Sequence, residues 1–186
     1  MTLPVLMSLA YKLLGTHMSY RKVDFYQDFE NISHSQVLEL FSHSNDINEP
    51  DATGDSPLLY ACKSKDIELI LFLLGKGADP NFVSASGMAP LHVTINEVEL
   101  NEVFALSAAN ALVHAGADIE LRAFLLKTPF LLACCRNSKA MIEFLVMSGC
   151  DTNAVTFDIG DSLNGLQLAS ISGVSADIKS YIKTLV

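Results

Sequence analysis

The chain has 186 residues, about the size of one domain; half of them are hydrophobic and 18% are charged. This balance excludes an intrinsically disordered chain, and ten Gly and six Pro are too few for a collagen-like or linker-like protein. Asp and Glu number 21 against 12 Lys and Arg, so the net charge is −9, and phosphate backbones would repel such a surface, which disfavours nucleic-acid binding.

The cysteines and histidines predict neither a disulfide scaffold nor a metal site. Cys134 and Cys135 are adjacent, Cys62 and Cys150 are isolated, and no two cysteines form a Cys-x-x-Cys motif. None of the five histidines forms a His-x₃-His pair, so we expect no zinc site and no cofactor. Reduced cysteines favour a cytoplasmic protein, with translocation into a host cell or export as the alternative.

The N-terminal stretch from Leu3 to Leu14 is apolar apart from Ser8 and Lys12. It is shorter than the ~20 residues of a membrane-spanning helix, so we expect no membrane partner. No basic side chain precedes it, which disfavours a signal peptide. We expect residues 1–17 to form a helical cap over the open end of the fold, with a targeting segment as the alternative.

Two motifs recur along the rest of the chain. Aspartates that follow a short turn sequence stand at positions 46, 79, 118 and 151, at steps of 33, 39 and 33 residues. Prolines that precede an apolar run stand at positions 57, 90 and 129, at steps of 33 and 39. Because two independent motifs share one period and one six-residue insertion, the sequence predicts a repeat architecture.

Each unit predicts two helices that end in a tight turn. A hydroxyl residue before the proline, such as Ser56, can cap the first helix, whereas Ala89 cannot. In the clearest unit we expect the first helix over 58–64 and the second over 66–75, after which Gly77 supplies a left-handed residue. One helix pair cannot bury its apolar faces alone, so neighbouring units must stack.

This pattern resembles the ankyrin repeat, whose period is 33 and whose signature is Thr-Pro-Leu-His-x-Ala. The resemblance covers about residues 35–186 and implies an all-α fold, a solenoid of stacked helix-turn-helix units with short β-hairpin loops. The expected units of this single domain are a degenerate first repeat at 18–48, repeats at 49–81, 82–120 and 121–153, and a C-terminal capping repeat at 154–186. The repeat at 82–120 carries the insertion.

Several positions depart from the family pattern. Leu59 and Leu131 replace the histidine of the fourth signature position, which only His92 keeps. The resemblance implies a structural role for His92, in which it bonds the neighbouring hairpin backbone. Leu126 stands where Gly54 marks a hairpin turn in an earlier unit. Asn164 and Gly165 stand where the last unit should carry its proline.

No motif predicts an enzyme. The chain contains no nucleophile elbow, Walker loop or Gly-x-Gly-x-x-Gly motif. Cys62 and Cys134 hold equivalent positions at which a small buried residue is expected. The inserted segment carries Glu97, Glu99 and Glu102, which we expect to be solvated on an exposed loop.

The candidate binding surface follows from the resemblance, since ankyrin-like proteins commonly meet partners at hairpin tips and at the ends of first helices. These positions are Ala52, Thr53, Asp55, Lys63, Ser64, Ala85, Ser86, Met88, Asn96, Glu97, Phe124, Leu125, Lys127, Cys135, Arg136, Phe157, Asp158 and Ile159. The tip at residues 124–126 is Phe-Leu-Leu, whereas hairpin tips are normally polar. Exposed apolar clusters mark interaction sites, and the alternative is that this loop is buried against its neighbour.

These observations predict a non-catalytic protein–protein interaction module that is monomeric on its own. Its partner would carry a basic surface, complementary to the net charge of −9. One form is an inhibitor or immunity-type protein that occludes a toxin or an enzyme. A secreted bacterial effector that acts on a host protein, and an accessory or regulatory subunit of an enzyme, are the alternatives.

Overall fold

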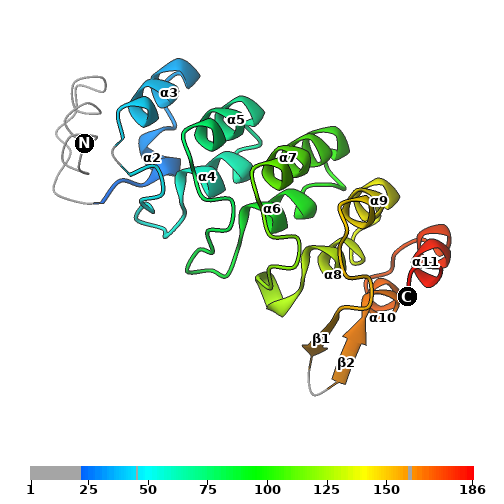
Figure 1. Cartoon of the computed structure of the whole chain (residues 1–186). Coiled ribbons are helices and arrows are strands. Elements are labelled where there is room, and N and C mark those ends of the chain that lie inside the picture. Colours follow the sequence, from blue (N-terminus) through cyan, green and yellow to red (C-terminus); the bar gives the residue numbers. More distant parts are fainter. Residues whose placement is uncertain (1–21, 45, 159–160) are drawn as a thin grey trace.

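The computed structural model of the chain describes residues 22–44, 46–158 and 161–186, so the predicted cap at residues 1–17 lies outside the described residues. Within them, five helix pairs follow one another and stack in a single row (Figure 1). The pairs are α2 (Phe25–Asp28) with α3 (His34–Ser42), α4 (Pro57–Lys63) with α5 (Ile67–Gly75), α6 (Pro90–Asn96) with α7 (Glu102–His114), α8 (Pro129–Ala133) with α9 (Lys139–Met147), and α10 (Gly165–Ile171) with α11 (Ala176–Lys183).

The stack has two layers of helices. First helices α4, α6, α8 and α10 contact one another in order, and second helices α3, α5, α7 and α9 form the other row (Figure 1). Each pair thereby covers apolar faces that its neighbour could not bury alone. This arrangement confirms the predicted all-α solenoid of stacked helix-turn-helix units. The residue limits proposed for the units stay a prediction.

Apolar side chains between the layers form one continuous core. Leu58, Ile70 and Leu73 are fully buried in the second pair, as are Leu131 and Ile142 in the fourth. Burial of each such side chain contributes about 1.5–3 kcal/mol. The apolar pattern of the repeats therefore accounts for the stacking.

The starts of the first helices follow the expected capping pattern. The hydroxyls of Ser56 and Thr128 accept hydrogen bonds from backbone amides in the first turns of α4 and α8, whereas Ala89 gives α6 no side-chain cap. In the last unit Asn164 accepts from the amide of Gln167, whose side chain accepts from the amide of Asn164. This capping box starts α10 without the proline that the family pattern places there.

Close packing explains the glycine at the next position. A Cβ atom added to Gly165 would lie 2.8 Å from Sγ of Cys134 and 3.1 Å from the ring of Phe130. Both neighbours belong to the preceding first-helix region, and Phe130 and Cys134 are themselves fully buried. The missing side chain therefore lets α10 approach α8.

The six-residue insertion lengthens two parts of one unit. The connection between α6 and α7 has five residues, 97–101, where the connection between α4 and α5 has three, 64–66. Helix α7 has 13 residues, four more than α5. Four residues add about one helical turn, so the insertion leaves the stacking of neighbouring units intact.

The recurring aspartate closes a turn after the second helix of each of the first four pairs. The carboxylates of Asp46, Asp79, Asp118 and Asp151 each accept a hydrogen bond, 2.8–2.9 Å long, from the backbone amide two residues later. The side chains of Asn48, Asn81 and Glu120, which occupy that later position, accept from the amides of Asp79, Asp118 and Asp151 in the next unit at 2.6–2.7 Å. The motif therefore ties each unit to the one that follows.

The predicted short hairpin loops differ in how far they form strands. Among the described residues, strands form only in the last unit, where β1 (Val155–Asp158) pairs antiparallel with β2 (Asp161–Asn164). In each earlier loop a backbone hydrogen bond joins the two ends of the tip; these bonds run from the amides of Asp51, Ser84 and Ala123 to the carbonyls of Asp55, Met88 and Lys127. A second bond closes the turn between them, from the amides of Gly54, Gly87 and Leu126 to the carbonyls of Asp51, Ser84 and Ala123. The earlier loops are too short for a ladder, and three extra residues in the last unit make one possible.

Candidate partner-binding surface

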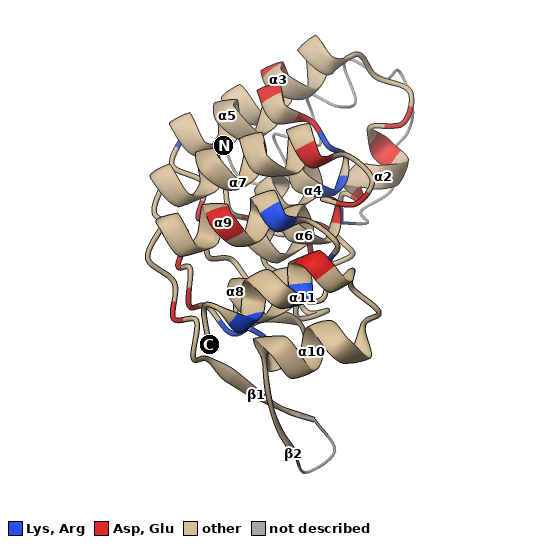
Figure 2. Ribbon diagram, turned by 90° about the vertical axis from the view of Figure 1, so that its right-hand side faces the viewer, with Lys and Arg blue, Asp and Glu red and all other residues tan. Residues whose placement is uncertain are grey.

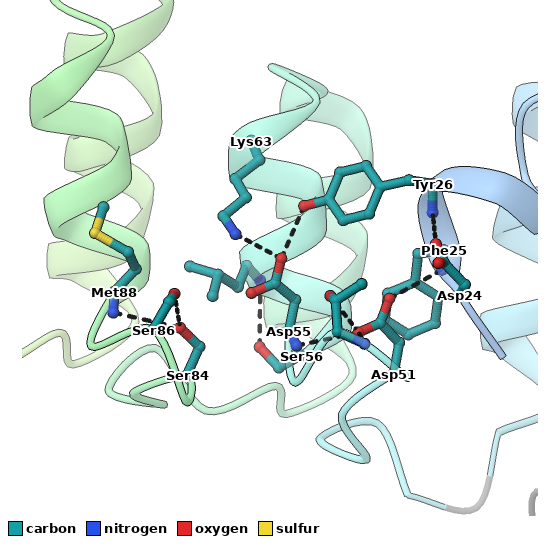
Figure 3. Close-up of polar contacts among 12 residues, drawn as sticks. Asp24, Phe25, Tyr26, Asp51, Asp55, Ser56, Lys63, Ser84, Ser86 and Met88 are labelled. Atoms are coloured by element: carbon teal, nitrogen blue, oxygen red, sulfur yellow. Dashed lines mark hydrogen bonds and ion pairs between the residues drawn. The ribbon is translucent and has the colours of Figure 1, made fainter. Parts of the chain in front are cut away.

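The tip of the second unit, at residues 51–55, is held by a buried carboxylate. Oδ1 of Asp51 accepts hydrogen bonds from the amide and hydroxyl of Thr53 and from the amide of Asp55. Oδ2 of Asp51 accepts from the amide of Phe25 in the first unit at 3.0 Å (Figure 3). Ala52 and Thr53 are exposed at this tip, as the predicted surface requires.

Asp55 was expected on the partner surface, and the structure places it inside the protein. Its carboxylate is 3% exposed, lies 2.6 Å from Nζ of Lys63, and accepts a hydrogen bond from the hydroxyl of Tyr26 at 2.9 Å (Figure 3). Burial, followed by the hydrogen bond to Asp55, raises the pKa of Tyr26 far above its usual range, which keeps this hydroxyl protonated as a donor. Asp55 and Lys63 are therefore an internal ion pair that fixes the tip against α2.

The next tip is less constrained. Ala85 and Ser86 are exposed, and Met88 is half-buried. The hydroxyls of Ser84 and Ser86 lie 2.8 Å apart, and the amide of Met88 donates to Ser84 at 3.3 Å (Figure 3). The side chains exposed at the end of this tip, Ala85 and Ser86, are small.

The ends of the first helices are joined by polar contacts between units. Nζ of Lys65 lies 2.8 Å from the carboxylate of Glu97, and Nη2 of Arg136 donates to Oδ1 of Asn96 at 2.5 Å. The predicted partner residues Asn96, Glu97 and Arg136 therefore already have internal partners. Ser64 is exposed in the same connection as Lys65.

The inserted carboxylates Glu99 and Glu102 are exposed, as expected from the sequence, but they also bind donors in the following unit, and Glu97 is half-buried. Glu99 accepts a hydrogen bond from the amide of Asn137 at 2.9 Å, and Glu102 accepts from the hydroxyl of Ser138 at 2.6 Å. The side chain of Glu97 is only 21% exposed. The longer connection and the first residue of α7 reach the following unit, where Glu99 binds an amide donor and Glu102 binds a hydroxyl donor.

The tip of the fourth unit is apolar and exposed. Residues Phe124–Leu126 form one turn of 3₁₀ helix, η1, in which Leu125 is 63% exposed and Leu126 is 62% exposed. The alternative of a buried loop is therefore wrong for the two leucines, whereas Phe124 is partly buried. Both leucines have a φ of 56°, a left-handed backbone that side-chain-bearing residues rarely adopt.

The β1–β2 hairpin extends this apolar tip. It projects beyond the helices, as Figure 2 shows, and Phe157 on β1 is 70% exposed. The hydroxyl of Thr156 lies 3.3–3.4 Å from the carbonyls of Leu125 and Leu126, which joins the hairpin to the tip. A cavity of about 300 Å³ lies between them, lined by Leu125, Leu126, Lys127, Thr156 and Phe157. We call these five residues the tip pocket.

Cys135 adds little to this surface, and two further predicted residues lie partly or wholly outside the description. Cys135 is half-buried, with its thiol 3.4 Å from the carbonyl of Leu131. The backbone of Asp158 belongs to β1, but its side chain and all of Ile159 lie outside the described residues. Of the predicted site residues, the structure brings together Leu125, Lys127 and Phe157.

Sequence reasoning missed three residues that shape the tip pocket. Leu126 was noted as an unusual turn residue, and its place in the Phe-Leu-Leu run was the signal that could have added it. Thr156 precedes Phe157 and is buried, as alternation along a strand requires. Nη1 of Arg122 donates to the carbonyls of Leu126 and Val155 at 3.1 and 2.8 Å, a contact with no sequence signal.

The histidine of the signature has the structural role that the resemblance implied. The imidazole of His92 is buried, and its Nε2 lies 2.9 Å from the carbonyl of Lys127 in the next tip. Burial lowers the pKa of His92, so the ring is neutral and Nε2–H donates to that carbonyl. The bond holds the backbone of Lys127, and with it one side of the tip pocket.

The described part of the chain contains no cluster of three or more His, Cys, Asp or Glu side chains that could hold a metal ion. Burial raises the pKa of the thiols of Cys62 and Cys134 well above the usual range, as expected of inert core residues. Among the described helices, none has the length and hydrophobicity needed to cross a bilayer.

Comparison with known proteins agrees with this geometry. A family model described as ankyrin repeats in three copies matches residues 29–123, and a model of the single ankyrin repeat matches residues 126–157. The chain is 31% identical over 120 residues to the human transient receptor potential cation channel subfamily A member 1, covering 64% of this chain and 10% of the channel subunit. It is 32% identical over 132 residues to an ankyrin repeat protein of Rickettsia felis, covering 65% of this chain and 55% of that protein.

A third relative is neurogenic locus notch homolog protein 1 of Xenopus laevis, 30% identical over 130 residues that cover 69% of this chain and 5% of that protein. The chain thus spans about half or less of the length of these relatives. The family models cover more than half of the chain. Within the matched region, each of the clear units has a proline at the start of its first helix, a stacked helix pair and an aspartate in the turn after its second helix. The chain therefore belongs to the ankyrin repeat family.

Proposed function

We propose that this chain is a non-catalytic module that binds a partner protein through the hairpin tips of its last two units. Ankyrin repeats generally mediate protein–protein interaction. The observation that carries the proposal is the exposed apolar cluster of Leu125, Leu126 and Phe157. Exposure of these side chains to water costs free energy that a partner would recover by covering them.

Partner charge is proposed from the distribution of charge along the chain. Residues 82–120 contain five Asp and Glu and no Lys or Arg, so this unit contributes most to the acidic balance. A partner that lies along the hairpin tips and the ends of the first helices would therefore present a basic surface to this unit. Complementary charge of this kind mainly raises the association rate and the selectivity.

The biological form proposed for the module is a cytoplasmic inhibitor or immunity-type protein. A rigid row of helix pairs can cover an active surface of its partner without changing shape, which suits steric inhibition. The alternatives are an effector that acts on a host protein and an accessory subunit of an enzyme. The identity of the captured partner separates these forms.

The test is affinity capture by the full chain, followed by mass spectrometry and a titration with the purified partner. The test variant combines Leu125→Ser, Leu126→Ser and Phe157→Ser. A matched control combines Leu71→Ser and Met147→Ser, which remove exposed apolar side chains from α5 and α9. We expect the tip variant to weaken partner binding at least about tenfold, because anchors of this size dominate interfaces, and the control to bind as wild type.

Equal loss of affinity in the tip and control variants would overturn the proposed location. Thermal melting of each variant shows whether the chain is still folded. If a captured partner binds the wild type, the tip variant and the control variant equally, the interface lies elsewhere on the molecule.

A further inference from the structure

We propose that the tip pocket binds a bulky apolar side chain from an acidic segment of the partner protein. The inference rests on the proposed function and adds the chemistry of the contact. The segment at the tip pocket is acidic, although the partner as a whole is expected to be basic, because cations lie beside the tip pocket while the whole chain is acidic.

The shape of the tip pocket suits a side chain. Its volume of about 300 Å³ is at the small end of ligand-binding pockets, and its walls are the exposed side chains of Leu125, Leu126 and Phe157. Its floor includes Thr156, which is 1% exposed. A pocket with three apolar walls buries an aromatic or branched aliphatic group better than it holds a charged one.

The walls are held in place without a partner. The carbonyl of Leu126 lies within hydrogen-bond distance of both Arg122 and Thr156, and the carbonyl of Lys127 is bonded by His92 from the preceding unit. The exposed leucines therefore sit on a backbone that three side chains fix from below. Because the walls are preorganised, less conformational entropy is lost when the pocket is filled.

Two described cations, Lys127 and Arg122, lie beside the tip pocket. Lys127 lines it, and the guanidinium of Arg122 is held at its edge by the carbonyls of Leu126 and Val155. Among the described side chains, neither cation lies within 4 Å of a carboxylate, whereas Lys63, Lys65 and Lys139 each do. These two cations are thus available to carboxylates of a bound segment.

The unit at residues 121–153, which contains Arg122 and Lys127, has more basic than acidic residues. Residues 121–153 contain four Lys and Arg, namely Arg122, Lys127, Arg136 and Lys139, against two acids, Glu143 and Asp151. This is a net charge of +2. Residues 154–186, which supply Thr156 and Phe157, hold two Lys and three Asp, so the two units together carry +1 in a chain whose total is −9. An acidic segment with an apolar anchor complements this unit, and a basic segment would be repelled at the same place.

The first experiment uses two dyes that differ by one charge. 1-Anilinonaphthalene-8-sulfonate carries an apolar ring system and an anion, and N-phenyl-1-naphthylamine lacks the sulfonate. We expect both dyes to bind saturably to the folded chain, and Leu125→Ser combined with Phe157→Ser to weaken both about tenfold. We expect Lys127→Gln to weaken the anionic dye about threefold and to leave the neutral dye unchanged.

The control for the charge effect is Lys76→Gln, which removes an exposed cation that follows α5. It should change the binding of neither dye. Equal effects of Lys127→Gln on both dyes, or unchanged binding to the double variant, would overturn the proposed pocket chemistry. The melting temperature of each variant distinguishes a lost pocket from a lost fold.

The second experiment uses short synthetic peptides as competitors of the anionic dye. One has a central Phe-Leu pair flanked by Asp and Glu, the second has the same pair flanked by Lys, and the third has Ala in place of the pair within the acidic flanks. We expect the acidic Phe-Leu peptide to displace the dye at least about tenfold more effectively than the other two. Displacement by the Lys-flanked peptide at an equal or lower concentration would contradict the inference.

The two proposals fail in different ways. If the captured partner is lost from the tip variant while the Lys-flanked peptide is preferred, the interface is correct and its inferred chemistry is wrong. If the captured partner binds the tip variant normally, the proposed interface is wrong, and the dye measurements still report whether the tip pocket selects anions.

Discussion

Backbone strain at the fourth tip shows how single residues shape the surface. In the second and third units the equivalent turn residues are Gly54 and Gly87, which adopt φ of 88° and 75° without a side-chain penalty. Leu126 adopts the same left-handed backbone with a side chain, at a cost of about 1–2 kcal/mol. Because the side chain is 62% exposed, packing within the chain recovers little of this cost.

We predict that Leu126→Gly keeps or raises the free energy of unfolding, by up to ~1 kcal/mol, because glycine relieves the strain. The matched control is Leu131→Ala at a fully buried leucine, which should lower stability by about 2–5 kcal/mol. Urea titration of both variants provides the measurement. A loss of more than ~2 kcal/mol in Leu126→Gly would show that this leucine stabilises the fold.

The second prediction at the residue scale concerns acid. His92 is buried and neutral, and its Nδ1 has no hydrogen-bond partner among the described atoms. Its pKa is lowered by burial, so as pH falls through the unfolded value near 6.5 the unfolded chain gains a proton that the folded chain does not. The contribution of His92 to stability is therefore complete above that pH and is lost progressively below it.

We expect the free energy of unfolding of the wild type to fall by up to about 1.4 kcal/mol per pH unit more than that of His92→Gln between roughly pH 6 and 5. The other titrating groups are present in both proteins, so their contributions to the pH dependence cancel when the two slopes are compared. Parallel stability profiles for the two proteins would contradict the role assigned to the buried ring.

At the scale of elements, the sequence predicted the helices better than the loops. The clearest unit was expected to form helices over 58–64 and 66–75, and the structure has α4 at Pro57–Lys63 and α5 at Ile67–Gly75. Local signals decide these ends, namely a capping hydroxyl, a proline in the first turn and a left-handed glycine. The hairpins depend instead on loop length and on contacts between units, which a single unit does not reveal.

The binding surface was predictable only in part for the same reason. Phe124, Leu125 and Phe157 were identified from an apolar composition that is unusual for a tip. Asp55 and Glu97, predicted as partner contacts, pair with Lys63 and Lys65 in the folded chain, and the sequence did not indicate these ion pairs. Arg122 was missed because its hydrogen-bond acceptors are backbone carbonyls that come together only when the fifth unit packs on the fourth.

The packing of α10 on α8 gives a prediction at this scale. Gly165→Ala places a methyl group 2.8 Å from Sγ of Cys134, and overpacking of this kind should lower stability by about 1–3 kcal/mol. Gly75→Ala is the matched control, since nothing lies within 4 Å of the added atom and alanine favours the helix.

Thermal unfolding of both variants, and of Gly165→Ala combined with Cys134→Ala, tests the cause. The smaller side chain at position 134 should restore part of the stability if the contact with sulfur is responsible. A neutral Gly165→Ala variant would show that the two helices can move apart at no cost.

At the scale of the whole molecule, polar contacts between units keep the row of helix pairs in register. The side chains of Asn48, Asn81 and Glu120 bond forward to the next unit along one edge, and Glu99 and Glu102 do so along another. Stability of such a row is approximately a sum of unit and interface contributions. The exposed side chains of the apolar tip take part in neither set of contacts, so they are available to another protein.

Site-specific photo-crosslinking tests the central claim most directly. A photoreactive benzoylphenylalanine replaces Leu125 in one full-length protein and Leu71, which is 56% exposed on α5, in another. The account predicts that, with the captured partner present, light produces one defined crosslinked species from position 125 and none from position 71. A crosslink from position 71 alone, while the partner remains bound, would contradict it.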